Sequence, residues 1–191
     1  MVLNRLRERL SPLLERVGRA FAATGLSANF WTGVGLAVAF AAAIVYGSFL
    51  EYAYILGGIL LLVSGFFDMV DGQVARATGR SSKRGAFLDS MFDKIAEVAI
   101  FAGLASGGLV APEIALLGIG MSLLVSYARA KADALNIQIR GVGVGERAER
   151  LLIIAIVGMI PGMMPFAVLA VVVISAITVA QRMRYVYGRL D

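Results

Sequence analysis

Six apolar stretches follow one another along this chain, and each is roughly as long as a membrane-spanning helix. They lie at about 30–50, 53–75, 86–106, 110–133, 148–164 and 165–187. An α-helix needs about 20 apolar residues to cross the hydrocarbon core of a bilayer. Apolar residues make up 59% of the 191 residues and charged residues 16%, whereas soluble domains have about 45–50% and about 25%. The sequence therefore predicts an all-α, polytopic membrane protein with six transmembrane helices.

The segment before these stretches has a different pattern. Apolar residues recur there at helical spacing with arginines between them: Leu3, Leu6, Leu10, Leu13, Leu14, Val17 and Phe21, with Arg5, Arg9, Arg16 and Arg19. A helix of this kind lies along an anionic membrane surface with its apolar side in the lipid. We therefore expect an amphipathic juxtamembrane helix over residues 1–24, followed by a six-helix transmembrane domain over residues 25–191.

The positive charges predict the orientation of the spans. With six spans, one side of the membrane holds the N-terminus, the 76–85 and 134–147 links and the C-terminus. All 18 Lys and Arg residues fall on this side or in adjoining helix ends, except Lys94 inside the third stretch. The positive-inside rule makes that side cytoplasmic, which predicts a multi-pass protein of the cell membrane with both termini in the cytoplasm. The formal charge of +5 then reflects orientation and affinity for anionic lipid, and no nucleic-acid partner is expected.

Histidine and cysteine are both absent, which excludes disulfides, thiol chemistry and the usual near-neutral acid or base. Four aspartates nevertheless lie inside apolar stretches, where a charge costs about 2.5–3.5 kcal/mol on insertion scales and is functional by default. Asp68 and Asp71 lie three residues apart near the end of the second stretch, and Asp89 and Asp93 lie four apart near the start of the third. Each pair shares one helix face, and the short link between the stretches brings the pairs together near the cytoplasmic surface.

Four carboxylates gathered at one place favour bound cations, because their mutual repulsion otherwise disfavours the ionised forms. A donor set made only of oxygen points to Mg²⁺ or Mn²⁺, with Ca²⁺ as an alternative, and two divalent ions would balance four carboxylates. Paired ions of this kind commonly serve phosphoryl transfer. Gly72 would let a flat group approach the backbone, and Arg76 offers a planar fork to a phosphate.

The spacing of these residues resembles the signature of the CDP-alcohol phosphatidyltransferase family at every fixed position: Asp68-x2-Asp71-Gly72-x2-Ala75-Arg76-x8-Gly85-x3-Asp89-x3-Asp93. The resemblance implies a reaction in which an acceptor hydroxyl attacks the lipid-bearing phosphorus of a CDP-linked lipid and CMP leaves. It also implies that Asp68, Asp71, Asp89 and Asp93 hold two divalent ions, Mg²⁺ or Mn²⁺. Asp93 would in addition be the base that takes the acceptor's proton.

The same resemblance assigns residues to the CDP-linked lipid. Gly72 and Arg76 would contact the CDP moiety, with Ser82 as a further contact. Many family members begin their first span with a Thr-Pro-Asn-like segment, and this chain has Ser-Ala-Asn at 27–29, followed by Thr32. Asn29 and Thr32 match that segment and could reach the nucleotide, although the proline is missing.

A more specific resemblance concerns the acceptor. Residues 126–133 read Ser-Tyr-Ala-Arg-Ala-Lys-Ala-Asp, and residues 145–150 read Gly-Glu-Arg-Ala-Glu-Arg. This order is similar to the phosphatidylinositol-phosphate synthase branch of the family and its archaeol-lipid relatives. It implies transfer of a phosphatidyl or archaetidyl group from CDP-diacylglycerol or CDP-archaeol to inositol phosphate. Lys131, Arg147 and Arg182 would then hold the phosphate of the acceptor.

Two alternatives stay open from the sequence alone. The same chemistry could use glycerol-3-phosphate as the acceptor, which would make the chain a phosphatidylglycerophosphate synthase. A divalent-cation transporter could use the acidic cluster as its transport site, although such sites lie near the bilayer midplane on discontinuous helices. The family resemblance also predicts a homodimer.

Overall fold

The computed structural model describes residues 2–79, 82–139 and 141–190, with side chains from Pro12 onward in the first range. Within these ranges the chain forms seven α-helices and no strand, which confirms the predicted all-α class. The helices are α1 (Val2–Ala22), α2 (Ala28–Gly47), α3 (Ala53–Ala77), α4 (Lys83–Ser106), α5 (Pro112–Ala134), α6 (Arg147–Gly158) and α7 (Met164–Tyr187).

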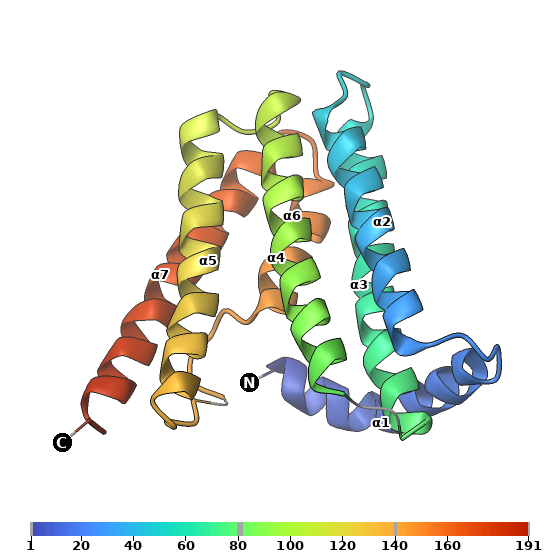
Figure 1. The fold of residues 1–191 in the computed structure, drawn as a ribbon. Helices are drawn as coiled ribbons and strands as arrows, with labels where there is room; N and C mark the ends of the chain where they lie inside the picture. Colours follow the sequence, from blue (N-terminus) through green and yellow to red (C-terminus); the bar gives the residue numbers. More distant parts are fainter. Residues whose placement is uncertain (1, 80–81, 140, 191) are drawn as a thin grey trace.

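The long helices α2, α3, α4, α5 and α7 run alongside one another, and α1 lies across one end of them (Figure 1). The links from α3 to α4 and from α5 to α6 lie at this same end, as does the C-terminus. The turns that follow α2, α4 and α6 lie toward the opposite end. The connections therefore separate into two sets, as a chain that crosses a membrane repeatedly requires.

Four helices are long and apolar enough to cross a membrane, namely α2, α3, α5 and α7. Helix α4 has the length, with 24 residues, but it carries Asp89, Asp93, Lys94 and Glu97. Helix α6 has only 12 residues, or about 18 Å at about 1.5 Å per residue, against a hydrocarbon core of about 30 Å. The chain is a multi-pass membrane protein, and α4 and α6 both depart from a simple apolar span.

The predicted fifth span, 148–164, is longer than the helix that forms there. Helix α6 ends at Gly158, and the chain then turns before α7, with Gly162 at a φ of 74°. Pro161 lacks the N–H that a continuing helix needs, and glycine adopts a positive φ at little cost. These two residues end the helix although the sequence around them stays apolar.

Helices α3 and α4 both pack closely against α2 through glycines. A Cβ added at Gly103 or Gly107 of α4 would overlap the backbone carbonyls of Ala43 and Tyr46 in α2. Gly57 of α3 lies against the Tyr46 ring of α2, so that an added Cβ would come within 2.5 Å of it. Small residues allow helix backbones to approach one another in this way. The Gly103 and Gly107 pair therefore serves packing within one chain.

Helix α1 is packed against α3 as well. A Cβ added at Gly18 would come within 2.6 Å of the Gln73 Cβ. Near the end of α1, Phe21 makes edge contacts with Trp31 and Phe67, with ring centroids 4.8 and 6.5 Å apart. The segment predicted to form a juxtamembrane helix is thus helical and is held across one end of the bundle. Its location at a membrane surface stays a prediction.

We expect Gly103→Ala to lower the thermal unfolding midpoint, because its methyl group meets the Ala43 carbonyl and overpacking costs about 1–3 kcal/mol. The matched control is Gly120→Ala in α5, where nothing crowds an added Cβ within 4 Å and alanine favours the helix. Fluorescence of Trp31 during heating in detergent measures both midpoints. Equal midpoints for the two variants would contradict the close packing of α4 on α2.

Candidate active site

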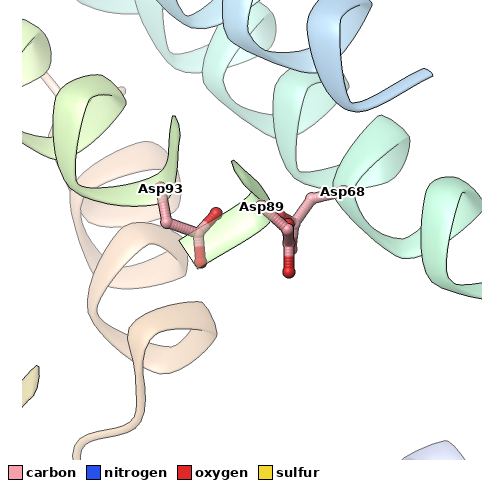
Figure 2. A group of neighbouring side chains, drawn as sticks. All are labelled: Asp68, Asp89 and Asp93. Carbon is pink, nitrogen blue, oxygen red and sulfur yellow. The ribbon is translucent and has the colours of Figure 1, made fainter. Parts of the chain in front are cut away.

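The link between α3 and α4 brings aspartates from both helices together. Ser82 caps the start of α4, where its Oγ accepts a hydrogen bond of 3.0 Å from the Gly85 N–H. Asp68 comes from α3, and Asp89 and Asp93 come from the second and third turns of α4. Carboxylate oxygens of these three residues lie within 4.8 Å of one another, as Figure 2 shows for the side chains. Three of the four predicted metal ligands therefore converge.

Asp71, the fourth predicted ligand, lies one helical turn beyond Asp68 in α3. It is 6% exposed, and its Oδ2 has no hydrogen-bond partner among the described residues. It lines the same small cavity as Asp68 and Asp93. A buried carboxylate oxygen without a partner is costly unless a cation or donor satisfies it. Converging oxygens and the absence of His and Cys fit Mg²⁺ or Mn²⁺.

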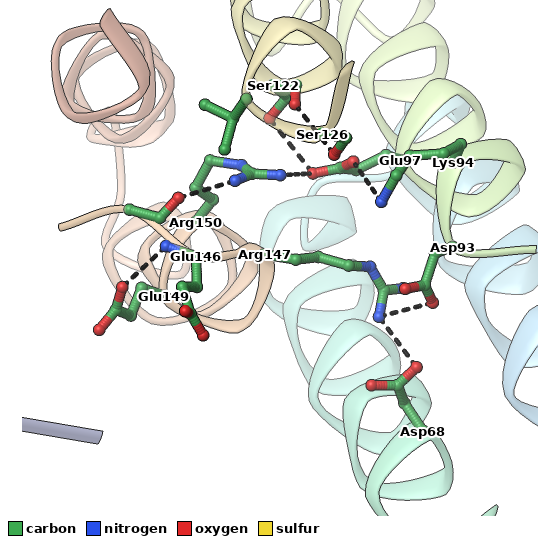
Figure 3. A network of polar contacts seen from close by, with 12 residues as sticks. Asp68, Asp93, Lys94, Glu97, Ser122, Ser126, Glu146, Arg147, Glu149 and Arg150 are labelled. Atoms are coloured by element: carbon green, nitrogen blue, oxygen red, sulfur yellow. Dashed lines mark hydrogen bonds and ion pairs between the residues drawn. The ribbon is translucent and has the colours of Figure 1, made fainter. Parts of the chain in front are cut away.

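Arg147, the first residue of α6, reaches into the aspartate cluster. Its Nη1 lies 2.9 Å from Asp68 Oδ1 and 2.8 Å from Asp93 Oδ1 (Figure 3). A capping box fixes this end of α6, in which the Glu146 N–H donates a 2.9 Å hydrogen bond to Glu149 Oε2. The sequence predicted Arg147 as a ligand of the acceptor phosphate, and the structure shows it paired with two predicted metal ligands.

A second ion pair lies deeper between α4 and α6. Arg150 Nη2 is 2.8 Å from Glu97 Oε1, and both residues are 1% exposed. Arg150 Nη1 donates a 2.8 Å hydrogen bond to the Gly145 carbonyl, and Ser122 Oγ donates one of 3.2 Å to Glu97 Oε1. Lys94 Nζ lies 4.0 Å from the other oxygen of Glu97. Neither Glu97 nor Arg150 was among the predicted site residues, although Glu97 follows Asp93 by one helical turn in an apolar stretch.

A hollow of about 210 Å³ opens on the side of the cluster that faces α2; we call it the α2-side hollow. All five residues predicted to bind the CDP-linked lipid line it: Asn29, Thr32, Gly72, Arg76 and Ser82. Asp71 and Asp89 form part of its wall. The structure therefore brings together residues from α2, α3 and the start of α4 that the resemblance had assigned to one ligand.

Glycines keep this hollow open. A Cβ at Gly72 would meet nothing within 4 Å except the Arg76 guanidinium nitrogens at 3.7 Å. A Cβ at Gly85 would sit 3.1 Å from Asn29 Oδ1 and 3.2 Å from Ser82 Oγ. A side chain at either position would thus narrow the space between α2 and the aspartates.

A larger hollow of about 540 Å³ lies on the other side of the cluster, between α4, α5 and α6; we call it the α6-side hollow. Its acidic wall contains Asp68, Asp89 and Asp93. Five basic residues also line it, which are Lys94, Arg129, Arg147, Arg150 and Arg182, and Asp133 and Glu146 add two further carboxylates. A group of cations around a space of this size suits an anionic ligand.

The three predicted acceptor residues differ in their placement. Arg147 and Arg182 line the α6-side hollow. The Arg182 guanidinium is engaged by backbone carbonyls, donating hydrogen bonds of 3.0 Å to Val142 and 2.6 Å to Val125. Lys131 lines a separate apolar hollow between α5 and α7. Arg129, which the sequence did not single out, lines the α6-side hollow instead.

The aspartates stand between the two hollows. Asp89 lines both of them, Asp71 lines only the α2-side hollow, and Asp68 and Asp93 line only the α6-side hollow. A ligand in one hollow could therefore react with a ligand in the other across the carboxylates. This arrangement suits transfer of a group between two anionic substrates.

Comparison with known proteins identifies relatives along the whole chain. A family model described as CDP-alcohol phosphatidyltransferase matches residues 26–181. The chain is 36% identical over 190 residues to archaetidylinositol phosphate synthase of Pyrococcus horikoshii, covering 100% of this chain and 99% of that protein. It is 35% identical over 177 residues to phosphatidylinositol phosphate synthase of Streptomyces avermitilis, covering 83% of this chain and 71% of that protein.

Solved structures share the fold. The crystal structure of Mycobacterium tuberculosis phosphatidylinositol phosphate synthase with CDP-DAG bound is similar, with a TM-score of 0.79 and 26% identity, covering 94% of this chain and 98% of that one. The same protein in complex with manganese and citrate is equally similar, with a TM-score of 0.79 and 26% identity, covering 93% and 92%.

We expect Asp68→Asn and Asp89→Asn each to weaken Mn²⁺ binding at least about tenfold, because each removes a charged oxygen ligand from a converging set. Titration of free Mn²⁺ by electron paramagnetic resonance, with purified protein in detergent, measures the affinity. Glu51→Gln is the matched control, since Glu51 is exposed in the turn before α3 and should leave the affinity unchanged. Wild-type affinity in both aspartate variants would contradict the metal site.

Proposed function

This chain belongs to the CDP-alcohol phosphatidyltransferase family, and we propose that it moves the phosphatidyl or archaetidyl group of a CDP-linked lipid onto inositol phosphate with release of CMP. One observation carries the proposal: the four aspartates line two neighbouring hollows, Asp89 belongs to both, and five basic residues also line the larger hollow. Relatives that are named archaetidylinositol phosphate synthase and phosphatidylinositol phosphate synthase support inositol phosphate as the acceptor.

The α2-side hollow would hold the CDP part of CDP-diacylglycerol or CDP-archaeol. Asn29, Thr32 and Ser82 supply polar side chains for the nucleotide along its walls. Arg76 would bind the diphosphate through its guanidinium, and Gly72 leaves room for that group beside the backbone. The similar crystal structure with CDP-DAG bound supports this assignment.

Asp68, Asp71, Asp89 and Asp93 would hold two Mg²⁺ or Mn²⁺ ions, as the converging oxygens and the manganese complex of the similar structure support. When bound, such ions polarise the donor diphosphate and offset the charge that develops on the leaving CMP. Asp93 lines the α6-side hollow, where its carboxylate would accept the proton of the acceptor hydroxyl. The oxygen of that hydroxyl forms the new bond to phosphorus while the bond from phosphorus to CMP breaks.

The α6-side hollow would bind the phosphate of the acceptor. Lys94, Arg129 and Arg147 present cationic groups there, and a phosphorylated acceptor would bring them an anionic group that a neutral acceptor lacks. Arg182 would act on the acceptor mainly indirectly, by fixing the backbone that lines the hollow, because its guanidinium donates hydrogen bonds to the Val125 and Val142 carbonyls. Lys131 stays a prediction, since the hollow that it lines is a different one.

We further propose that all of α2 to α7 enter the membrane, giving the six spans predicted from the sequence. The charges of α4 would be tolerated because Asp93 and Glu97 pair with arginines of α6 and not with lipid. The turns at 48–52, 107–111 and 159–163 contain no Lys or Arg, which supports a cytoplasmic location for the opposite end with both termini. Residues 1–24 would lie on that surface, and residues 25–191 would form the catalytic domain in the cell membrane.

A homodimer also stays a prediction. The structure offers no support from Gly103 and Gly107, whose small size is used between α4 and α2 of one chain. Crosslinking in native membranes tests the assembly directly.

Four acceptors can be compared with purified protein, a CDP-linked lipid and Mg²⁺ or Mn²⁺: inositol phosphate, glycerol-3-phosphate, inositol and serine. We expect CMP release to be fastest with inositol phosphate. Inositol lacks the phosphate that the cations of the α6-side hollow would bind, so its rate should be at least about tenfold lower. Faster release with glycerol-3-phosphate would make the acceptor assignment wrong while leaving the family chemistry intact. Release of CMP with no acceptor would be the background to subtract.

We expect Arg129→Gln to raise the KM for inositol phosphate about tenfold or more, because loss of a charged hydrogen-bond partner costs about 1.5–3 kcal/mol. Lys131→Gln should change that KM by less than about twofold, since Lys131 does not line the α6-side hollow. The KM for the CDP-linked lipid serves as the internal control in both variants. The opposite ranking of the two variants would assign the acceptor phosphate to Lys131, as predicted from the sequence.

A further inference from the structure

Two ionic contacts join α4 and α6, one helical turn apart. Arg147 and Arg150 are three residues apart on α6, and Asp93 and Glu97 are four apart on α4, so each pair shares one helix face. Arg147 pairs with Asp93 at 2.8 Å, and Arg150 pairs with Glu97 at 2.8 Å (Figure 3). We call them the outer contact and the inner contact, because Arg147 also touches Asp68 at the mouth of the site.

The inner contact is fixed by its surroundings. The side chains of Arg150 and Glu97 are 1% and 0% exposed, and Gly145 and Ser122 provide further hydrogen bonds to them. Breaking a buried ion pair leaves an uncompensated charge in the interior, which costs about 3–5 kcal/mol. The start of α6 is therefore held to α4 by Arg150 whatever happens to Arg147.

The outer contact lies where a divalent cation could take the place of the Arg147 guanidinium. The side chain of Asp68 is 38% exposed, that of Asp93 20% and that of Arg147 18%, and all three line the α6-side hollow. The oxygens that Arg147 Nη1 touches belong to carboxylates that a divalent ion would require. A guanidinium and a divalent cation repel each other and compete for the same lone pairs.

We propose that Arg147 is the counter-ion that a divalent metal displaces from Asp68 and Asp93, and that the Arg150–Glu97 pair keeps the displaced guanidinium in the α6-side hollow to bind the acceptor phosphate. Only the Arg147 side chain has to rotate, because the inner contact and the Glu146–Glu149 capping box hold the backbone of α6. This inference rests on the proposed function for the presence of a metal and of a phosphorylated acceptor.

Displacement couples the two ligands. Metal binding frees Arg147 for phosphate, so the metal should raise the affinity for the acceptor, and the acceptor should raise the affinity for the metal by the same factor. Metal loading would then come before productive acceptor binding. Arg147 would neutralise the carboxylates in the metal-free state and would bind the acceptor phosphate in the metal-bound state.

Mn²⁺ binding to the purified full chain, followed by electron paramagnetic resonance without either substrate, tests the competition. Arg147→Gln should bind Mn²⁺ at least about fivefold more tightly than wild type. Arg129→Gln is the matched control, because it removes one positive charge from the same hollow but no contact with Asp68 or Asp93. The gain in Arg147→Gln should exceed that in Arg129→Gln, and equal gains would overturn the displacement.

Calorimetric titration with inositol phosphate, with and without Mn²⁺, tests the coupling. Wild type should bind inositol phosphate at least about fivefold more tightly when Mn²⁺ is present, and Arg147→Gln should lose this difference. If wild type binds Mn²⁺ through Asp68 and uses inositol phosphate, but Mn²⁺ leaves the phosphate affinity unchanged, this inference fails and the proposed function stands. If wild type neither binds Mn²⁺ nor uses inositol phosphate, the proposed function itself fails.

The positioning role of the inner contact needs a variant that folds. The double variant Glu97→Gln and Arg150→Met removes both charges of the buried pair together, while Lys94, whose side chain is 25% exposed, loses its contact with Glu97. The variant should keep the KM for the CDP-linked lipid. It should raise the KM for inositol phosphate about tenfold and lose the coupling with Mn²⁺, whereas Arg150→Lys should restore part of both. Equal rises in the two KM values, or no rise in either, would show that the pair has only a structural role.

Discussion

Negative charge gathered among apolar helices is the constraint on which the rest of this structure depends. Four aspartates and Glu97 lie in helices whose other residues are mostly apolar, and such charges are tolerated only beside opposite charge, metal or water. Arginines from α6 supply the opposite charge. Arg147, the first residue of this short helix, pairs with Asp68 and Asp93. The two hollows then remain as polar spaces on either side of the carboxylates.

The parts of the site that the sequence predicts are those set by local geometry. Spacings of three and four residues place aspartates on one helix face, and a link of five residues after α3 leaves little freedom in how the two faces meet. Gly72 and Ser82 line one hollow for the same reason, since each lies near a helix end at the α3–α4 link. Asn29 lies at the start of α2 and reaches the same hollow through the packing of α2 on α3 and α4. The family resemblance named all three residues, and short-range connection explains only the convergence of Gly72 and Ser82.

The parts of the site that the sequence did not predict depend on long-range packing. Arg129 and Lys131 are two residues apart on α5 and so face different directions, and the rotation of α5 against α7 decides which of them lines the α6-side hollow. Glu97 and Arg150 are 53 residues apart, and no local pattern joins them. The hydropathy of the sequence does not reveal that α6 ends at Gly158, because Met159 and Ile160 continue the apolar run up to Pro161.

The position of the aspartates along α3 and α4 bears on the choice between a group-transfer enzyme and a cation transporter. Asp71 and Asp68 lie six and nine residues before the end of α3, and Asp89 and Asp93 lie six and ten after the start of α4, or about 9–15 Å from the helix ends at about 1.5 Å per residue. Both helices continue without interruption through their aspartates, whereas transport sites lie near the midplane on broken helices. A cluster at this depth can meet a nucleotide from the water and a lipid whose chains stay in the bilayer.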